Sequence, residues 1–119
     1  MLQRDWKVKF YQRPNGRRPA KEYLDDLAYD ERERMIRQMG RLKRWGPQLT
    51  RPDSGYLRDK IHELRAEWQG VQLRILYFRD DEYFWLTNGL RKKTNRVPES
   101  DINRAVDYRR EYFAQKRGE

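Results

Sequence analysis

The sequence contains no cysteine, one histidine and no long apolar run. Without cysteine the chain forms no disulfide, holds no cysteine-ligated zinc and has no thiol nucleophile, which is compatible with a reducing compartment. The lack of a long apolar run predicts neither a membrane span nor a signal peptide, so we expect a cytoplasmic protein. A glycine-rich phosphate loop, a Gly-x-Ser-x-Gly elbow and paired histidines for a metal are also missing, and any histidine-based triad would depend on His62 alone.

These absences leave two possibilities for the chain. One is a reaction without metal or other cofactor, in which cations stabilise a pentavalent phosphorane and a Lys, Arg, Tyr or Glu side chain handles protons. The other is no reaction at all. Positive charge is abundant, with 28 Lys and Arg residues against 19 Asp and Glu residues, a net charge of +9 and a pI near 10.0. This excess favours an anionic partner.

The hydrophobic content supports a modest core. Hydrophobic residues make up 36% of the 119 residues and aromatic residues 13%, which argues against disorder throughout the chain. The sequence shows no repeat, linker or low-complexity tract. We therefore expect one domain over residues 1–119.

Periodicity predicts a mixture of strands and helices. Strands are expected over Trp6–Tyr11, Ile61–Trp68, Val71–Arg79 and Tyr83–Leu90. The expected helices start at Pro19 with a break near Ala28, at Asp30 as N-cap with Glu33 as its partner and an end near Trp45, and at Pro98 with an end before Lys116. The core stripe of the second helix is expected to contain Met35, Ile36, Met39 and Leu42, and a polar loop is expected over Pro52–Gly55.

A reversal at Gln69-Gly70 sets the register of the two central strands. The predicted apolar pairs are Trp68 with Val71, Ala66 with Leu73, and Leu64 with Ile75. The same register places Arg65 opposite Arg74 on the other face, with Glu63 and Glu67 on the diagonals. Two guanidinium groups so placed repel unless an anion lies between them. Two interpretations stay open, a surface salt-bridge lattice and a seat for a phosphate.

A second reversal at Asp80-Asp81 extends the face that carries Arg74. The predicted pairs are Arg74 with Thr87, Leu76 with Trp85, and Phe78 with Tyr83. We expect the last helix or the N-terminal residues to cover part of these apolar groups, and any that stay open could stack nucleobases. On the opposite face His62 pairs with Tyr77, where a packed histidine is expected more than a catalytic one.

The order of several short motifs resembles the HigB-like, phage-derived branch of the RelE/ParE toxin superfamily, across about residues 5–113. These motifs are Glu63-Leu64-Arg65, Arg74-Ile75-Leu76-Tyr77-Phe78, Leu86, Gly89-Leu90-Arg91-Lys92-Lys93-Thr94, Pro98 and Ile102-x-x-Ala105. The resemblance implies an α+β, RelE-like fold with a small, mostly antiparallel sheet, two N-terminal helices and a C-terminal helix. It also implies an mRNA endoribonuclease that acts on the ribosome without metal or cofactor, held inactive by a cognate helix-turn-helix antitoxin. In such enzymes the RNA's own 2′-hydroxyl attacks the adjacent phosphate.

The resemblance also implies roles for individual residues. Arg74 resembles the phosphate-binding arginine and Arg65 its companion, while Glu63 would orient Arg65 or act as a base. Lys92 and Lys93 resemble a lysine pair of which one stabilises the leaving oxygen and the other holds RNA. Further RNA contacts are expected from Lys60, Arg91, Arg96 and Trp85.

The sequence departs from the family pattern at Thr87-Asn88. Relatives often carry a histidine in this segment, and the amide of Asn88 cannot donate a proton as imidazolium does. This departure leaves the identity of the general acid open. Two rival functions also stay open, a basic module that binds nucleic acid or a partner helix without cutting, and, as the superfamily alone suggests, a gyrase inhibitor of the ParE type.

Overall fold

The computed structural model describes residues 5–92 and 96–118, which form the predicted α+β fold. The elements in chain order are β1 (Lys7–Phe10), α1 (Pro19–Asp26), α2 (Tyr29–Trp45), the short 3₁₀ helix η1 (Gly46–Gln48), β2 (Ser54–Arg58), β3 (Ile61–Trp68), β4 (Val71–Asp80), β5 (Tyr83–Lys92) and α3 (Glu99–Lys116). The sheet order is β1-β5-β4-β3-β2. Only β1 pairs in parallel with its neighbour among the described strands, so the sheet is mostly antiparallel.

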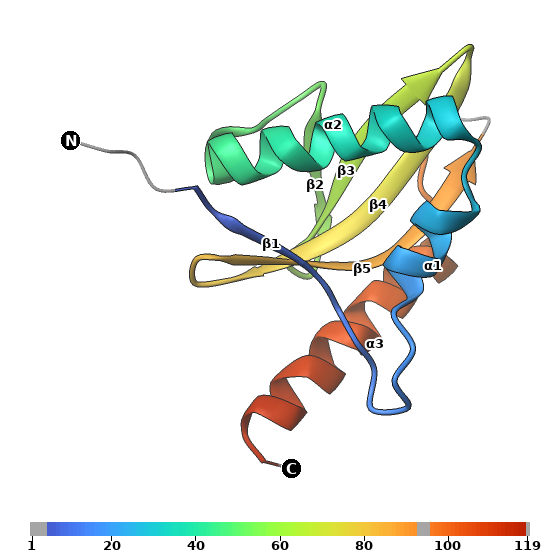
Figure 1. Cartoon of the computed structure of the whole chain (residues 1–119). Helices are drawn as coiled ribbons and strands as arrows, with labels where there is room; N and C mark the ends of the chain where they lie inside the picture. The colour runs from blue at the N-terminus through green and yellow to red at the C-terminus, as the bar shows by residue number, and fades with distance from the viewer. Residues whose placement is uncertain (1–4, 93–95, 119) are drawn as a thin grey trace.

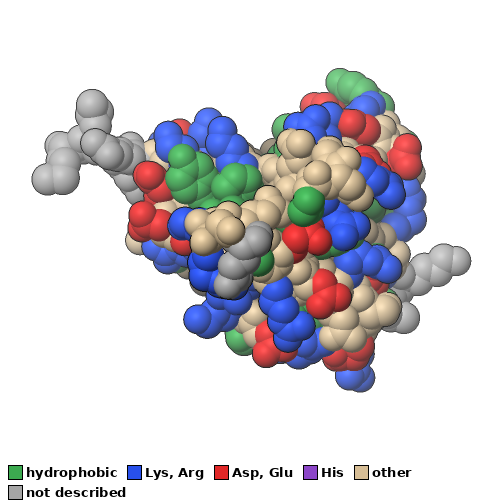
Figure 2. All heavy atoms as spheres, turned by 90° about the horizontal axis from the view of Figure 1, so that it is seen from below, with side chains coloured by type: hydrophobic (Ala, Val, Ile, Leu, Met, Phe, Trp, Pro, Cys, Tyr) green, Lys and Arg blue, Asp and Glu red, His purple; other side chains and the backbone are tan. Residues whose placement is uncertain are grey.

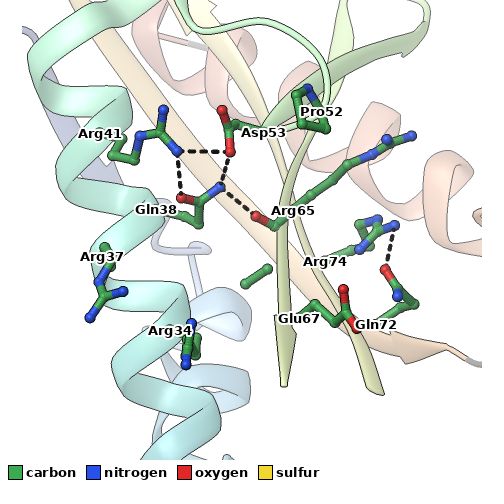
Figure 3. Close-up of a pocket in the computed structure, with 11 residues that line it drawn as sticks. Arg34, Arg37, Gln38, Arg41, Pro52, Asp53, Arg65, Glu67, Gln72 and Arg74 are labelled. Carbon is green, nitrogen blue, oxygen red and sulfur yellow. Dashed lines mark hydrogen bonds and ion pairs between the residues drawn. The ribbon is translucent and has the colours of Figure 1, made fainter. Parts of the chain in front are cut away.

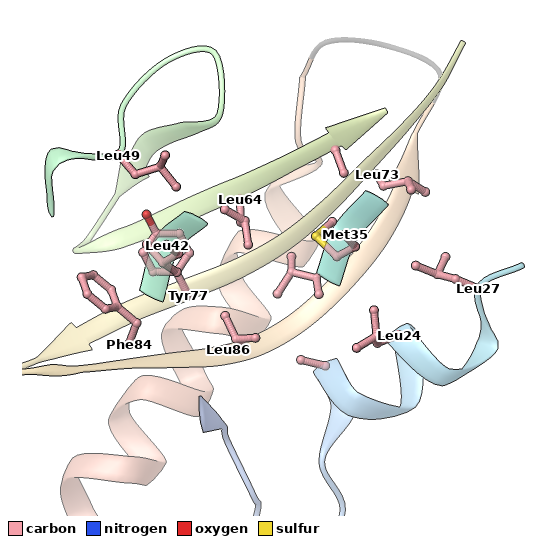
Figure 4. Packing of buried hydrophobic residues seen from close by; sticks show 13 residues of the cluster. Leu24, Leu27, Met35, Leu42, Leu49, Leu64, Leu73, Tyr77, Phe84 and Leu86 are labelled. Atoms are coloured by element: carbon pink, nitrogen blue, oxygen red, sulfur yellow. The ribbon is translucent and has the colours of Figure 1, made fainter. Parts of the chain in front are cut away.

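The two N-terminal helices cover one face of the twisted sheet, and α3 lies on the other (Figure 1). Under α2 the side chains of Met35 and Leu42 are fully buried against Leu64, Leu73 and other strand residues (Figure 4). The expected core stripe of α2 is thus confirmed at these two positions and for Met39, which packs against the cluster. Ile36 is exposed, because its position on the helix turns it away from the sheet, so its assignment to the stripe was wrong.

The face that carries Arg74 is partly covered by α3, as expected. Ile102 and Ala105 of the helix pack on Leu76 and Phe78 of β4 in a second apolar cluster. Further along β4, Arg74 contacts the polar side chains of Glu63 and Gln72.

The first hairpin has the predicted register. Arg65 pairs with Arg74, Leu64 with Ile75, and His62 with Tyr77. Gln69 and Gly70 form the reversal, both with positive φ. The two arginines therefore lie side by side on one face of the sheet.

The second hairpin differs from its prediction in two ways. The reversal occurs one residue later, at Asp81-Glu82, so that Phe78 pairs with Trp85 rather than with Tyr83. A β-bulge then follows, because the pair of Tyr77 with Leu86 is succeeded by the pair of Leu76 with Asn88. The extra residue is Thr87, which is buried and whose hydroxyl donates a hydrogen bond to the carbonyl oxygen of Leu76.

This bulge determines which basic residue of β5 lies on the same face of the sheet as Arg65 and Arg74. Beyond it Arg74 pairs with Leu90, and Gln72 pairs with Lys92. Cross-strand partners share a face, so Lys92 lies on the side of Arg74 and Arg91 on the side of α2. An unbroken register would have placed these two side chains the other way round.

Two further expectations were wrong. The expected polar loop over Pro52–Gly55 runs into an edge strand, β2, whose polar start and glycine hid it from pattern reading. The second helix starts at Tyr29 with Ala28 as its N-cap, because Glu31 accepts a hydrogen bond from the Ala28 backbone N–H at 3.3 Å. Asp30 therefore lies inside the first turn rather than at the cap.

Candidate active site

A carboxylate and two guanidinium groups form the centre of the site. Glu63 on β3 and Arg74 on β4 are each only 3% exposed, and Arg74 Nε donates to Glu63 Oε1 at 2.7 Å. Arg65 lies two residues along β3 on the same face, with its Nε 3.4 Å from the same oxygen. The expected neighbourhood of Arg65, Arg74 and Glu63 is confirmed, and Glu63 lies between the two cations as the counter-charge.

Arg74 is held mainly by protein acceptors. Its Nη1 donates to the backbone carbonyl of Leu73 at 2.9 Å and its Nη2 to Gln72 Oε1 at 3.2 Å. The sequence predicted a head group outside the core, but the guanidinium turns back onto its own strand and is buried. Burial lowers the pKa of Arg74 from its usual value, against the opposing effect of Glu63.

Arg65 is the accessible arginine of the pair. Its side chain is 23% exposed, and its Nη2 donates a long hydrogen bond of 3.4 Å to Glu63 Oε2. It lines two cavities, one of about 420 Å³ between α2 and the β3–β4 pair, and one of about 620 Å³ between β2 and the start of α3. Figure 3 shows its side chain extending from the strands on the side away from α2. Arg65 is therefore shared by the walls of the two cavities.

Lys92 joins the cluster through the bulge. The residue is only 7% exposed, and its Nζ is buried without a hydrogen-bond partner among residues 5–92 and 96–118. Burial, and next the positive charge of Arg74, lower the pKa of Lys92. A lysine with this property gives up its proton more readily than an exposed one, which suits proton transfer. Lys93, the other member of the predicted pair, lies outside the described residues.

The cluster carries more positive than negative charge. Arg65, Arg74 and Lys92 share one carboxylate, that of Glu63, and all four groups interact electrostatically. Buried cations without matching anions are costly, and a bound anion lowers that cost. The arrangement therefore favours a ligand that brings negative charge, such as an RNA phosphate.

The other predicted RNA contacts are dispersed. Arg96 lines the 620 Å³ cavity together with Arg65. Lys60 lies in the β2–β3 turn and is exposed, beyond the residues that line either cavity. Arg91 is on the α2 face, where both terminal nitrogens donate to the Glu31 carboxylate at 2.7 Å. Trp85 is half-buried between Tyr83 and Tyr112 beneath α3, apart from the arginine cluster.

Sequence reasoning missed the arginines of α2. Arg34, Arg37 and Arg41 line the 420 Å³ cavity, across β3 from Arg65 (Figure 3). Their spacing of three and four residues was a readable signal, since it places them on one face of a helix. A hydrogen-bond chain fixes this side of the cavity, because Gln38 donates both to Asp53 at 3.1 Å and to the Arg65 carbonyl oxygen at 2.7 Å.

Part of the surface carries cations and acidic groups side by side. The face seen in Figure 2 shows Lys and Arg side chains interspersed with Asp and Glu. Arg17 with Glu22 and Lys21 with Asp25 are examples of exposed ion pairs.

A family model for phage derived protein Gp49-like (DUF891) matches residues 22–110, which is most of the chain. The chain therefore belongs to this Gp49-like family, a RelE-like toxin family of phage origin. No curated protein matches the sequence. In the part of the chain that the structure describes, no helix is long and apolar enough to cross a membrane.

Proposed function

We propose that the protein is the toxin of a type II toxin-antitoxin system and cleaves mRNA on the ribosome. The observation that carries this proposal is the cluster of three cations around one buried carboxylate, with Arg65 open to two cavities. Membership of a RelE-like family supports the same reaction. Such a cluster suits a reaction whose transition state carries extra negative charge on phosphate oxygens.

In the proposed reaction the RNA's 2′-oxygen bonds to the adjacent phosphorus as the bond from phosphorus to the 5′-oxygen breaks. The products are a 2′,3′-cyclic phosphate and a free 5′-hydroxyl, so a proton must leave the 2′-oxygen and another must reach the 5′-oxygen. Arg65 would bind the phosphate, with Glu63 and Arg74 holding it in place. Lys92 would donate the proton to the leaving oxygen, and Glu63 is the nearest carboxylate that could accept the other.

The family's missing histidine fits this assignment. Asn88 is buried, and its Nδ2 donates to the Asp101 carbonyl oxygen at 3.2 Å, which ties β5 to the start of α3. The residue therefore has a structural contact where relatives carry an imidazole. Proton donation then falls to Lys92, which the bulge at Thr87 brings onto the reacting face.

The proposed partners are the ribosome with its mRNA and a helix-turn-helix antitoxin. Because the cationic cavities would bind phosphate, an antitoxin that covers them or blocks entry to the ribosome would stop cleavage. The gene beside this one is expected to encode the antitoxin.

Mapping of mRNA 5′ ends after brief expression tests the proposal. Cuts at fixed positions within translated codons are expected. DNA-damage signalling without such cuts would point to a gyrase inhibitor, and neither effect would point to a binding module that cuts nothing. Either result overturns the nuclease.

A further inference from the structure

A third cavity lies on the other side of the edge strand β2 and has a different character. It encloses about 490 Å³, and aromatic rings form much of its wall. The lining residues used below are Arg51, Tyr56, His62, Tyr77, Arg79 and Phe84. Two cations beside several aromatic rings match what a nucleotide requires, since rings stack on the base and arginines bind the phosphate.

Tyr56 gives this cavity a fixed and open aromatic surface. The residue is 55% exposed, which is unusual for so large a side chain. Its hydroxyl accepts a hydrogen bond from the Lys60 backbone N–H at 3.1 Å, and its ring meets His62 edge-on with centroids 5.1 Å apart. The ring is therefore held in one orientation without being covered, as a stacking surface should be.

His62 and Tyr77 form a rigid wall behind Tyr56. Their rings stack with centroids 5.2 Å apart and planes within 18°. The Tyr77 hydroxyl hydrogen-bonds to Ser54 Oγ on β2, so this pair is fixed to the edge strand. The only histidine of the chain thus lies directly in the cavity wall.

This cavity adjoins the proposed active site. Arg51 and Tyr56 line both it and the 620 Å³ cavity that contains Glu63 and Arg65. A methyl group added to Gly55 would lie 3.6 Å from the Arg51 guanidinium carbon and 3.7 Å from Glu63 Oε2, so both side chains lie next to Gly55. An RNA strand whose cut phosphate lies at Arg65 could therefore pass Arg51 into the aromatic cavity.

We propose that the cavity around Tyr56, His62 and Tyr77 binds the base of a nucleotide next to the cut, with Arg51 on its phosphate. This inference rests on the proposed nuclease function and adds a base-binding subsite to it. The subsite would influence which sequences are cut, because a nucleotide far from the reacting atoms contributes binding that the enzyme uses to position the cut phosphate.

The single histidine provides a direct measurement that needs no cleavage. The side-chain NMR signal of His62 is followed while the four nucleoside 3′-monophosphates are added, each in a separate titration, with inorganic phosphate as comparison. A saturable shift is expected with at least one nucleotide and not with phosphate alone. Tyr56→Ala should weaken binding roughly ten- to hundredfold, as loss of a stacked ring does, whereas Tyr56→Phe should retain it.

Tyr29→Ala is the matched control, because Tyr29 is also an exposed tyrosine but lies at the start of α2. Nucleotide binding by this variant should equal that of the wild type, and circular dichroism confirms the fold of each. Absence of any shift, an equal shift with phosphate alone, or undiminished binding by Tyr56→Ala would overturn the subsite. If the wild type binds a nucleotide but cuts no mRNA, the subsite is supported and the nuclease function is rejected. If it cuts mRNA but binds no nucleotide, the nuclease function is supported and the subsite is rejected.

Discussion

Arg65 is the arginine of the cluster that a phosphate can reach, since its side chain is 23% exposed and that of Arg74 only 3%. Replacing it by alanine should lower the rate of cleavage by about 10²–10³, the effect of losing one preorganised donor. Binding of the mRNA-ribosome complex should change much less, because the contact strengthens as charge develops. Single-turnover cleavage of ribosome-bound mRNA measures this rate. Lys9→Ala, an exposed cation on β1, is the control and should cut at nearly the wild-type rate, and full activity of Arg65→Ala would remove the assignment.

Arg74 carries a different expectation, because it is buried against Glu63. The sequence predicted a head group outside the core, and on that basis Arg74→Ala would leave the fold intact. In the structure the substitution removes the closest partner of a buried carboxylate and leaves it only the longer contacts with Arg65, so we expect the free energy of unfolding to fall by about 3–5 kcal/mol. Urea denaturation measures the loss. Adding Glu63→Gln should recover part of it, whereas Arg104→Ala, at an exposed ion pair, should change stability by less than about 0.5 kcal/mol.

His62 makes stability depend on pH. Burial lowers its pKa in the folded protein, so between that pKa and the unfolded value near 6.5 the unfolded chain binds more protons. The free energy of unfolding should therefore fall as the pH drops from 7 through this range. The carboxylates whose pKa values are lowered, such as Asp80 and Glu111, lose their contribution only at lower pH.

The matched variant for this effect is His62→Phe, which keeps an aromatic ring against Tyr77 but has no proton to gain. Thermal unfolding measured at pH 7 and at pH 5.5 should show a smaller difference for the variant than for the wild type. Equal differences would mean that burial of His62 does not set the acid sensitivity of the fold.

At the scale of the elements, α1 packs closely on β5 at Gly89, where there is no side chain on the strand. A methyl group on Gly89 would lie 2.1 Å from Cδ2 of Tyr23, whose hydroxyl donates to the Leu90 carbonyl oxygen at 2.8 Å. Gly89→Ala should therefore displace the ring and lower the free energy of unfolding by about 1–3 kcal/mol. Gly40→Ala on α2, where nothing lies within 4 Å, should instead raise stability by about 0.5–1 kcal/mol. Urea denaturation compares the two, and a neutral Gly89→Ala would contradict this packing.

The elements also show why part of the fold could be predicted and part could not. The register of β3 and β4 was predictable because only one alignment puts the apolar residues on one face, and that alignment fixes Arg65 beside Arg74. The bulge at Thr87 leaves no such pattern in the sequence. The extra residue is accommodated because its side chain is buried and its hydroxyl donates a hydrogen bond to the carbonyl oxygen of Leu76, and both depend on the folded structure. The placement of Lys92 on the same face as Arg74 therefore could not be read from the sequence.

The burial of the site was hidden for a similar reason. Alternation along a strand predicts which face a side chain takes, but it says nothing about whether the head group then folds back onto the backbone, as that of Arg74 does. The arginines of α2 were recognisable by their spacing, yet their position across β3 from Arg65 depends on how the helix packs on the sheet. The sequence thus showed which residue types lie on which face of the sheet. It did not show how deeply a side chain is buried or which side chains of other elements it contacts.

For the whole molecule, the net charge of +9 and the cation cluster around Arg65 predict different effects of salt on RNA affinity in charge-removing variants. About three phosphate contacts on a single strand give a loss of affinity of roughly tenfold or more between 50 and 200 mM salt. If these contacts include the α2 side of the site, the double substitution Arg34→Gln with Arg37→Gln should flatten the salt dependence. Arg104→Gln with Arg110→Gln removes the same charge from α3 and should leave the slope nearly unchanged.

Titration of fluorescent mRNA-ribosome complexes at several salt concentrations measures the two slopes. Long-range attraction by net charge alone would flatten both variants equally, because each loses two positive charges, and this result would reject a local phosphate interface. A helix-turn-helix antitoxin that covers the cavities should compete with the ribosome for the wild type. Since Arg34 and Arg37 line one of those cavities and the α3 arginines line neither of the two next to Arg65, competition should weaken for the α2 variant and persist for the α3 variant.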